Sequence, residues 1–356
     1  MRPQLARGLI IAFLISACGG GATTPTPSPS TAASSAPTAA PTAAKATCPA
    51  TNVKIAVPVT PPNVVHLPPY VAQELGYFKD ENLTVELVRF EGGVGALRAM
   101  VAGGVDLAGT SSEPLVTAIA QGVEVRAIGT YSPAISQVLA VGAGIKTAAD
   151  LKGKKIGIQE PGGFADALSR AYLKKNNVAA TDVQFVTTTT AARVQQLVAG
   201  AVDTGILHVD QILTVQKNAP QITVLANMWE VLPDYQYAVY AAPAAQANSD
   251  KYECIMRALT KANRAMYDPA QRQKILDMAV RETKADAAIV KQAFETLEKA
   301  KAWPQNDGLP KKNIEGTVQS LFDNKQIDKM VKYEDIVDLR AVNKVIAQLG
   351  KKDWPY

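Results

Sequence analysis

The chain has 356 residues, of which 47% are hydrophobic and 19% charged, a balance typical of globular proteins. This length is more than one ordinary core requires and indicates two domain-sized units. The formal net charge is only +5, and no basic cluster alternates with aromatic residues. The composition therefore gives no reason to expect a nucleic acid as partner.

The N-terminus carries the features of an export signal. Arg2 and Arg7 precede the apolar run 9–15, which is too short to span a membrane as a helix. The following Ile15-Ser16-Ala17-Cys18 resembles a bacterial lipobox, in which the cysteine is lipidated and becomes the mature N-terminus. We expect a lipoprotein signal peptide over 1–17 and acyl chains such as palmitate that hold Cys18 at the extracytoplasmic membrane surface. The alternative is a plain signal peptide with a chance cysteine.

A low-complexity segment follows the predicted lipidation site. Residues 19–47 are Gly, Ala, Thr, Ser and Pro, with Lys45 as the only charged residue. Such a composition cannot bury a core, so 18–50 is predicted to be the lipidated cysteine followed by a disordered tether.

Two further cysteines remain after Cys18. An exported protein can join Cys48 to Cys254 by a disulfide, or keep two unpaired thiols, and the sequence does not decide between these alternatives. No spacing resembles a metal site, and the chain has only two histidines. We therefore expect no metal and no cofactor.

Alternating strands and helices begin after residue 52. The pattern predicts a strand over 53–59, a helix over 68–78 opened by two prolines, a strand over 83–87 and a helix over 95–103. This alternation predicts an α/β fold with a mainly parallel sheet covered by helices on both faces.

A six-residue element occurs twice. Val101-Ala102-Gly103-Gly104-Val105-Asp106 is repeated as Val198-Ala199-Gly200-Ala201-Val202-Asp203. In each copy apolar residues end a helix, the chain turns at glycine, and a short strand follows. Chance similarity between two common turns is the alternative. However, each copy lies at the same position in its own series of alternating strands and helices. We therefore favour two lobes of similar plan over one continuous sheet.

Three stretches resemble a known family. They are 63–78, then 104–109 with Gln121-Gly122 one helix later, and 145–157, which begins Ile-Lys-Thr-Ala-Ala-Asp-Leu-Lys-Gly. Over roughly 52–270 the sequence is similar to the solute-binding proteins for sulfonates, taurine, nitrate and thiamine-pyrimidine precursors.

The resemblance implies the type II periplasmic-binding-protein fold, with two Rossmann-like lobes joined by a hinge that the chain crosses twice. We expect the crossings near Gly142 and Tyr240. Lobe one would then comprise 51–142 and, with the C-terminal helices, 240–356, while lobe two would comprise 143–239.

Ligands of open α/β sheets bind beyond the carboxyl ends of the strands, so the loops at those ends are the candidate site. Two of these loops belong to each lobe, and a solute that contacts both lobes would favour their closure. The candidate ligand-binding residues are Asn63, His66, Thr110, Ser111, Ser112, Glu113, Gln159, Gly162, Gly163, His208 and Asp210.

Several of these candidates also have a structural explanation. Hydroxyls at the start of a helix suit an anionic group, but one of them would suffice as an N-cap. Glu113 is better explained as a complement to the helix dipole. The histidines are nearly as well explained by packing. Trp229, Tyr235 and Tyr237 could stack on a ring, although packing near the hinge is their default role.

Together with the export signal, the resemblance implies the lipid-anchored, monomeric solute-binding subunit of an ABC importer, working with a permease and an ATPase. Its ligand would be a small organic solute, either a sulfonate-like anion or a heteroaromatic such as a pyrimidine or flavin. The alternatives are an enzyme similar to the thiamine-pyrimidine synthases of this fold, or a sensor that binds ligand without transport. No catalytic residue is predicted, because the sequence has no convincing Schiff-base lysine, nucleophile elbow or Walker motif.

Overall fold

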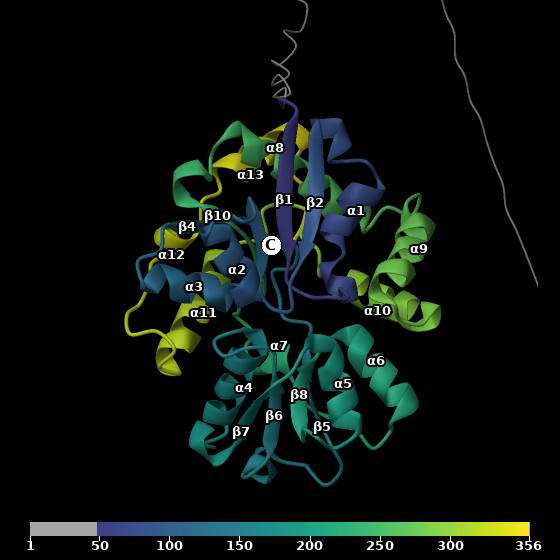
Figure 1. Cartoon of the computed structure of the whole chain (residues 1–356), viewed down its shortest axis with the longest axis vertical. Helices are drawn as coiled ribbons and strands as arrows, with labels where there is room; N and C mark the ends of the chain where they lie inside the picture. The colour runs from purple at the N-terminus through teal and green to yellow at the C-terminus, as the bar shows by residue number, and fades with distance from the viewer. Residues whose placement is uncertain (1–47, 356) are drawn as a thin grey trace, which may run out of the picture. The chain divides into compact units, whose positions relative to one another are not determined.

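Two five-stranded mixed sheets organise residues 48–355, which are the residues that this computed structural model describes (Figure 1). The first sheet has the order β2-β1-β3-β10-β4, formed by Thr51–Val57 (β1), Leu83–Arg89 (β2), Leu107–Ser111 (β3), Val125–Gly129 (β4) and Ala238–Pro243 (β10). The second has the order β7-β6-β8-β5-β9, formed by Val138–Val141 (β5), Lys155–Ile158 (β6), Gln184–Thr187 (β7), Thr204–Leu207 (β8) and Thr223–Asn227 (β9). The predicted signal peptide, Cys18 and most of the predicted tether lie outside the described residues.

We call the first sheet with its helices lobe one and the second sheet with its helices lobe two. The helices of lobe two are Phe164–Lys175 (α4), Thr190–Val198 (α5), Val209–Asn218 (α6) and Met228–Val231 (α7). Those of lobe one are Pro68–Glu74 (α1), Gly93–Val101 (α2), Ser112–Ala120 (α3), Asp250–Ala265 (α8), Arg272–Thr283 (α9), Ala287–Lys299 (α10), Lys311–Asp323 (α11), Tyr333–Ile336 (α12) and Arg340–Leu349 (α13). Short 3-10 turns are Val64–His66 (η1), Lys79–Glu81 (η2), Ala148–Leu151 (η3), Ala180–Asp182 (η4) and Ala244–Gln246 (η5).

One strand of each sheet runs against its neighbours. In lobe one β10 is antiparallel to β3 and β4, and in lobe two β5 is antiparallel to β8 and β9. The other pairs, β1 with β2 and β3, and β6 with β7 and β8, are parallel. The expected fold class, two α/β lobes with a two-crossing hinge, is confirmed.

The first crossing differs from the expected position near Gly142. Strand β5 ends at Val141 and pairs with strands of lobe two, so the chain has already crossed between residues 130 and 137. A boundary at 142 is therefore too late in the sequence. The return lies before β10, between 232 and 237, slightly ahead of Tyr240.

The repeated six-residue element has the same structural role in both lobes. Oδ2 of Asp106 accepts a hydrogen bond from the backbone N–H of Lys54 at 2.7 Å, and Oδ2 of Asp203 accepts one from that of Lys155 at 2.8 Å. Each aspartate thus fixes the strand next to its own in the sheet.

Helix α1 is shorter than the predicted 68–78. Gly76 has a φ of +77°, a conformation that glycine adopts without strain. The N–H of Tyr77 donates to the carbonyl of Ala72, and the N–H of Gly76 donates to that of Gln73. This Schellman-type pattern ends the helix at Glu74.

The helices after β10 pack mainly on lobe one. Helix α8 contacts α1 and α13, α9 contacts α1, and α11 and α12 contact α3. Helix α10 also contacts α6 of lobe two. None of the helices described between residues 48 and 355 has the length and apolar character that a membrane crossing requires.

Candidate functional site

A small cavity of about 30 Å³ lies where the carboxyl edges of the two sheets meet. Its walls come from both lobes and from both hinge crossings. The lining residues are Pro58, Val59, His66, Gly92, Gly93, Ser111, Tyr131, Gln159, Glu160, Gly163, Phe164, His208 and Tyr237. Sites for small organic ligands usually measure roughly 300–1,000 Å³, so the lobes must separate to admit a solute.

Aromatic rings form much of the wall. The rings of His66 and His208, one from each lobe, lie 5.2 Å apart between centroids. Phe164 of lobe two lies 4.6 Å from Tyr237 on the return crossing, and Tyr131 lies 5.5 Å from His66. Such walls suit a flat or apolar ligand body.

The two histidines are neutral. Burial lowers the pKa of His66 to about 3 and holds the pKa of His208 well below its usual range. The amide nitrogen of Gln137, which can only donate, lies 3.0 Å from Nδ1 of His208. Nε2 of His208 therefore carries the proton and offers a neutral donor. Nε2 of His66 lies 2.9 Å from the hydroxyl of Tyr237, while its Nδ1 has no hydrogen-bond partner.

Only one hydroxyl of the Thr110-Ser111-Ser112 loop lines the cavity. Thr110 donates its hydroxyl to the carbonyl of Gly93, and Ser112 donates to that of Gln236. Ser111 is the N-cap residue of α3, yet its side chain makes no capping bond, and the residue lines the cavity. The capping explanation thus does not account for Ser111.

Glu113 lies in the first turn of α3, away from the cavity wall. Its side chain is fully buried, and this burial raises the pKa of its carboxyl to about 7. The hydroxyls of Ser111 and Tyr235 lower the pKa by less. Tyr235 itself is buried, while Trp229 is 42% exposed and lines a different groove.

The loop after β6 is divided between two environments. Gly163, the N-cap residue of α4, lines the cavity, whereas Gly162 faces a surface groove beside α2 and α3. Gln159 lines the cavity and uses both ends of its amide. Its nitrogen donates to the Thr190 hydroxyl at 2.9 Å, and its oxygen accepts from Arg193 at 2.6 Å.

Arg193 is a buried cation behind Gln159. Its side chain is 1% exposed, and no carboxylate in residues 48–355 forms an ion pair with it. Burial lowers the pKa of its guanidinium to about 10, which leaves the group charged at neutral pH. A buried charge without a counter-ion is costly, so this residue needs an explanation.

Asn63 and Asp210 meet across the lobes. The side-chain amide of Asn63 donates to Oδ2 of Asp210 at 2.9 Å. Burial raises the pKa of Asp210 to about 6, against the opposing effect of hydrogen bonds from Asn63 and the N–H of Val64. Both side chains line a second pocket of about 440 Å³ beside α5, α6 and α9, not the small cavity.

Several lining residues were not among the sequence candidates. Glu160 lies in the same loop as the predicted residues Gln159, Gly162 and Gly163. Gly92 and Gly93 follow β2 at the same carboxyl edge and were not predicted. Tyr131 belongs to the hinge crossing, and Phe164 begins α4. The rule that neighbouring strands share an edge could have identified the Gly92-Gly93 loop.

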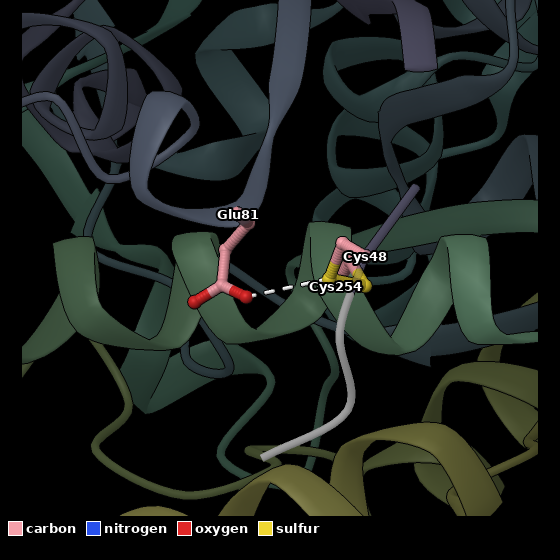
Figure 2. Close-up of side chains that lie close together, drawn as sticks. All are labelled: Cys48, Glu81 and Cys254. Atoms are coloured by element: carbon pink, nitrogen blue, oxygen red, sulfur yellow. Dashed lines mark hydrogen bonds between the residues drawn. A yellow bond between two sulfur atoms is a disulfide. The ribbon is translucent and has the colours of Figure 1, made fainter. Parts of the chain in front are cut away.

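A second cluster of reactive side chains lies at the opposite end of β1. The structure joins Cys48 to Cys254 of α8 by a disulfide, with 6.1 Å between their Cα atoms. Figure 2 shows the carboxylate of Glu81 directed at this bond, with Oε2 at 3.4 Å from the Cys48 sulfur.

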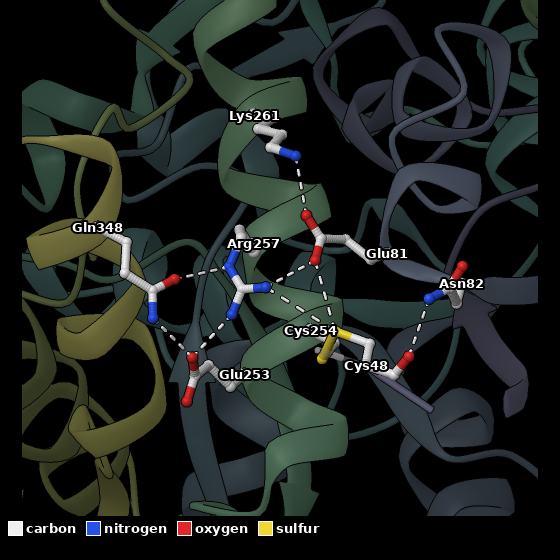
Figure 3. Close-up of polar contacts among 8 residues, drawn as sticks. All are labelled: Cys48, Glu81, Asn82, Glu253, Cys254, Arg257, Lys261 and Gln348. Carbon is white, nitrogen blue, oxygen red and sulfur yellow. Dashed lines mark hydrogen bonds and ion pairs between the residues drawn. A yellow bond between two sulfur atoms is a disulfide. The ribbon is translucent and has the colours of Figure 1, made fainter. Parts of the chain in front are cut away.

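A buried ion network surrounds the disulfide (Figure 3). Arg257 donates to Glu81 at 2.6 Å and to Glu253 at 2.7 Å, and Lys261 donates to Glu81 at 2.8 Å. Cys48, Cys254 and Glu81 offer ligand atoms within 4.8 Å of one another, a spacing that suits a metal ion. The sulfurs are bonded to each other and two cations face the carboxylate, so this cluster is structural.

The family model described as NMT1/THI5 like matches residues 63–272, which is more than half of the chain. The chain belongs to the NMT1/THI5-like family. A curated relative, the "Putative thiamine biosynthesis protein" of Haemophilus influenzae, is 32% identical over 126 residues, covering 35% of this chain. The match spans only 40% of that relative's own length.

Solved structures share the fold of this NMT1/THI5-like chain. The alkanesulfonate-binding protein SsuA of Xanthomonas axonopodis pv. citri, bound to MOPS, has a TM-score of 0.67 at 19% identity, covering 82% of this chain and 99% of that one. The ligand-binding component of an ABC-type import system of Staphylococcus aureus, with zinc bound, has a TM-score of 0.67 at 14% identity, covering 83% and 98%. At such identities the likeness shows the fold alone.

Proposed function

We propose that this protein captures a small organic solute between its lobes and delivers it to an ABC importer. The observation that carries the proposal is the cavity at the meeting carboxyl edges, whose walls come from both lobes. A solute held there contacts both lobes, so its binding energy favours closure, and closure is the signal that a permease can recognise.

The lining supports two chemical classes of solute. The rings of His66, Tyr131, Phe164, His208 and Tyr237 suit a heteroaromatic body such as a pyrimidine or flavin. The uncompensated charge of Arg193 behind Gln159 suits a sulfonate-like or other acidic group. A ligand that has both a ring and an acidic group would satisfy both features.

Membrane attachment and partners complete the proposal. Acyl chains on Cys18 would hold the protein at the extracytoplasmic surface, where a tether of the predicted length keeps it close to the permease. We propose a monomer, working with permease and ATPase subunits. The Staphylococcus aureus neighbour, described as a component of an ABC-type import system, supports this assignment.

The enzyme alternative is less well supported. A synthase that uses pyridoxal phosphate needs a lysine for the Schiff base, and none of the cavity-lining residues in the described part of the chain is a lysine. Both histidines are neutral and hydrogen bonded to neighbouring side chains, a state suited to binding. We therefore propose a binding role without chemistry.

A thermal-shift screen with a matched pair of variants tests this proposal. Solutes of the acidic, neutral heteroaromatic and basic classes are added to purified protein, and a ligand that binds only the native state raises the melting temperature. Phe164→Ala should abolish the shift because it removes a cavity wall. Phe322→Ala, which changes a side chain that is 40% exposed, should keep it. A shift that survives in Phe164→Ala and in His208→Gln would place the binding site elsewhere and overturn the proposal.

A further inference from the structure

A carboxylate of lobe two lies on the first turn of a helix in lobe one. Oε1 of Glu160, in the loop between β6 and α4, accepts a hydrogen bond from the backbone N–H of Val94 at 2.7 Å. The N–H of Gly95 is close enough to lower the pKa of the same carboxyl, although burial raises it overall. The bond therefore spans the cleft and joins the lobes directly.

Helix α2 has no cap of its own. Its N-cap residue is Gly92, which offers no side-chain acceptor to the free N–H groups of the first turn. The repeat aligns Gly92 with Thr189 of lobe two, which caps α5 by accepting from the N–H of Ala192 at 3.0 Å. Helix α2 of lobe one thus lacks the local cap that α5 of lobe two has. The carboxylate of Glu160, which belongs to lobe two, takes the place of that cap.

The space around Gly92 fits this carboxylate closely. A Cβ placed on Gly92 would overlap the carboxylate of Glu160, and one on Gly93 would press on the hydroxyl of Thr110. Gly92, Gly93 and Glu160 all line the cavity together with buried His66, whose Nδ1 has no hydrogen-bond partner. The contact therefore closes one end of the binding site itself.

We propose that Glu160 is a built-in anionic occupant of the α2 N-terminus, which adds to the Asn63–Asp210 bond in holding the lobes together without ligand and excludes acidic ligand groups from that end of the cleft. A helix N-terminus with free N–H groups attracts anions, and here the protein's own carboxylate fills the position. The exclusion of ligand groups rests on the proposed function, whereas the bond between the lobes does not.

The consequence is a specificity rule for the cleft. An acidic solute must direct its negative group away from α2, toward the side where Arg193 lies behind Gln159. A solute that brings its negative group to α2 must first displace Glu160 and meets the repulsion of that carboxylate. Glu160 is thus a specificity-determining residue as well as a latch.

The first experiment needs no solute. Hydrogen exchange of the Val94 and Gly95 amides is compared in the wild type, Glu160→Ala, Glu160→Gln and the control Glu230→Ala, which removes an exposed acid of lobe two. We expect exchange roughly tenfold faster or more in Glu160→Ala, an intermediate rate in Glu160→Gln, and no change in the control. The radius of gyration from small-angle scattering should rise in Glu160→Ala only.

The second experiment probes the freed helix terminus with inorganic sulfate. Glu160→Ala should bind sulfate roughly tenfold more tightly than the wild type or the Glu230→Ala control, since the helix terminus is then unoccupied. Unchanged amide exchange and unchanged scattering in Glu160→Ala would overturn the latch. Equal sulfate affinity in the wild type and Glu160→Ala would overturn the exclusion. Because neither probe is the transported solute, failure of the proposed function would leave both results interpretable.

Discussion

The two lobes share one plan but differ at a three-residue contact inside each. In lobe one, Ala56 of β1 lies opposite Ala108 of β3 in the sheet register, and both belong to one buried cluster with Ala96 of α2. All three side chains are fully buried. Three small residues let the helix pack closely on the sheet.

At the equivalent positions lobe two has two glycines and an arginine. Gly157 of β6 lies opposite Gly205 of β8 in the matching register, and the repeat places Arg193 of α5 where lobe one has alanine. A Cβ on Gly205 would lie 2.9 Å from Cδ of Arg193, and one on Gly157 would lie 3.2 Å from its Cγ. The missing methyl groups make room for the arginine stem.

The difference shows how one scaffold can acquire a charged side chain at its ligand-binding edge. The stem of Arg193 runs over the two glycines, so its guanidinium reaches Gln159 at the carboxyl edge of the sheet. Lobe one instead has the uncapped helix terminus that Glu160 fills. Lobe two therefore contributes both charged side chains, Arg193 and Glu160. Lobe one contributes the N-terminus of α2, to which Glu160 bonds.

The largest expected effect concerns the covalent link, which lobe one has and which the described part of lobe two lacks. The disulfide joins residues separated by 206 positions. Replacing both cysteines, Cys48→Ser with Cys254→Ser, should lower the free energy of unfolding by about 2–5 kcal/mol, because the unfolded chain regains its freedom. Urea denaturation measures the loss. An unchanged free energy of unfolding in the double variant would contradict this prediction.

The second prediction compares two buried acids at matching positions, Glu113 in the first turn of α3 and Asp210 in the first turn of α6. Folding raises the pKa of Glu113 from 4.5 to about 7. The contribution of Glu113 to stability is therefore fully present below pH 4.5 and is lost as the pH rises through 7. The free energy of unfolding falls by about 3 kcal/mol at most over this range. Glu113→Gln should remove this loss.

For Asp210 the pKa rises from 3.8 to about 6, so the corresponding loss falls between pH 4 and pH 6. Melting temperatures of Glu113→Gln and Asp210→Asn, each measured against the wild type from pH 4 to pH 8, separate the two windows. The comparison with the wild type cancels the opposite contribution of His66, whose pKa is lowered. Identical pH profiles for both variants would be inconsistent with these assignments.

The third prediction changes the glycine contact of lobe two. Gly205→Ala should destabilise the protein by about 1–3 kcal/mol, because the new methyl group presses on the stem of Arg193. Combining it with Gly157→Ala and Arg193→Ala reproduces the three alanines of lobe one and should recover most of that loss. Thermal denaturation of the single and triple variants decides. A triple variant less stable than Gly205→Ala would show that Arg193 stabilises lobe two.

The sequence predicted the plan of the fold because periodicity and the repeat are local features. The exact ends of the lobes, in contrast, depend on hydrogen bonds between strands that lie far apart in the sequence. Strand β5 joins lobe two through hydrogen bonds to β8 and β9, which no local pattern around Gly142 reveals. The shorter α1 could have been predicted, since Gly76 is a common helix terminator.

The site was predicted in part, for a physical reason. Loops at carboxyl edges are identifiable from the order of elements, and five of the predicted residues line the cavity, namely His66, Ser111, Gln159, Gly163 and His208. Which side chain of a loop faces the cavity depends on local rotation, and Thr110 turns away to the carbonyl of Gly93. The role of Glu160 arises only when the other lobe approaches, so its partner Val94 is invisible to sequence periodicity.

The smallest expected effect on stability distinguishes the two N-cap residues that line the cavity, Ser111 of α3 and His208 of α6. Ser111→Ala should change the free energy of unfolding without ligand by only about 0.5 kcal/mol, because its hydroxyl makes no capping bond. His208→Gln should lower the free energy of unfolding by more, since the side chain of His208 bonds to Gln137.

The same Ser111 variant also tests binding. With a solute identified by the thermal-shift screen, calorimetry of Ser111→Ala should show a loss of binding free energy. We expect about 1.5–3 kcal/mol if the ligand group at Ser111 is charged and about 0.5–1.5 kcal/mol if it is neutral. Because Ser111 belongs to the lobe whose helix α2 is closed by Glu160, we expect the smaller loss. Unchanged affinity together with a large loss of stability would show instead that Ser111 is structural.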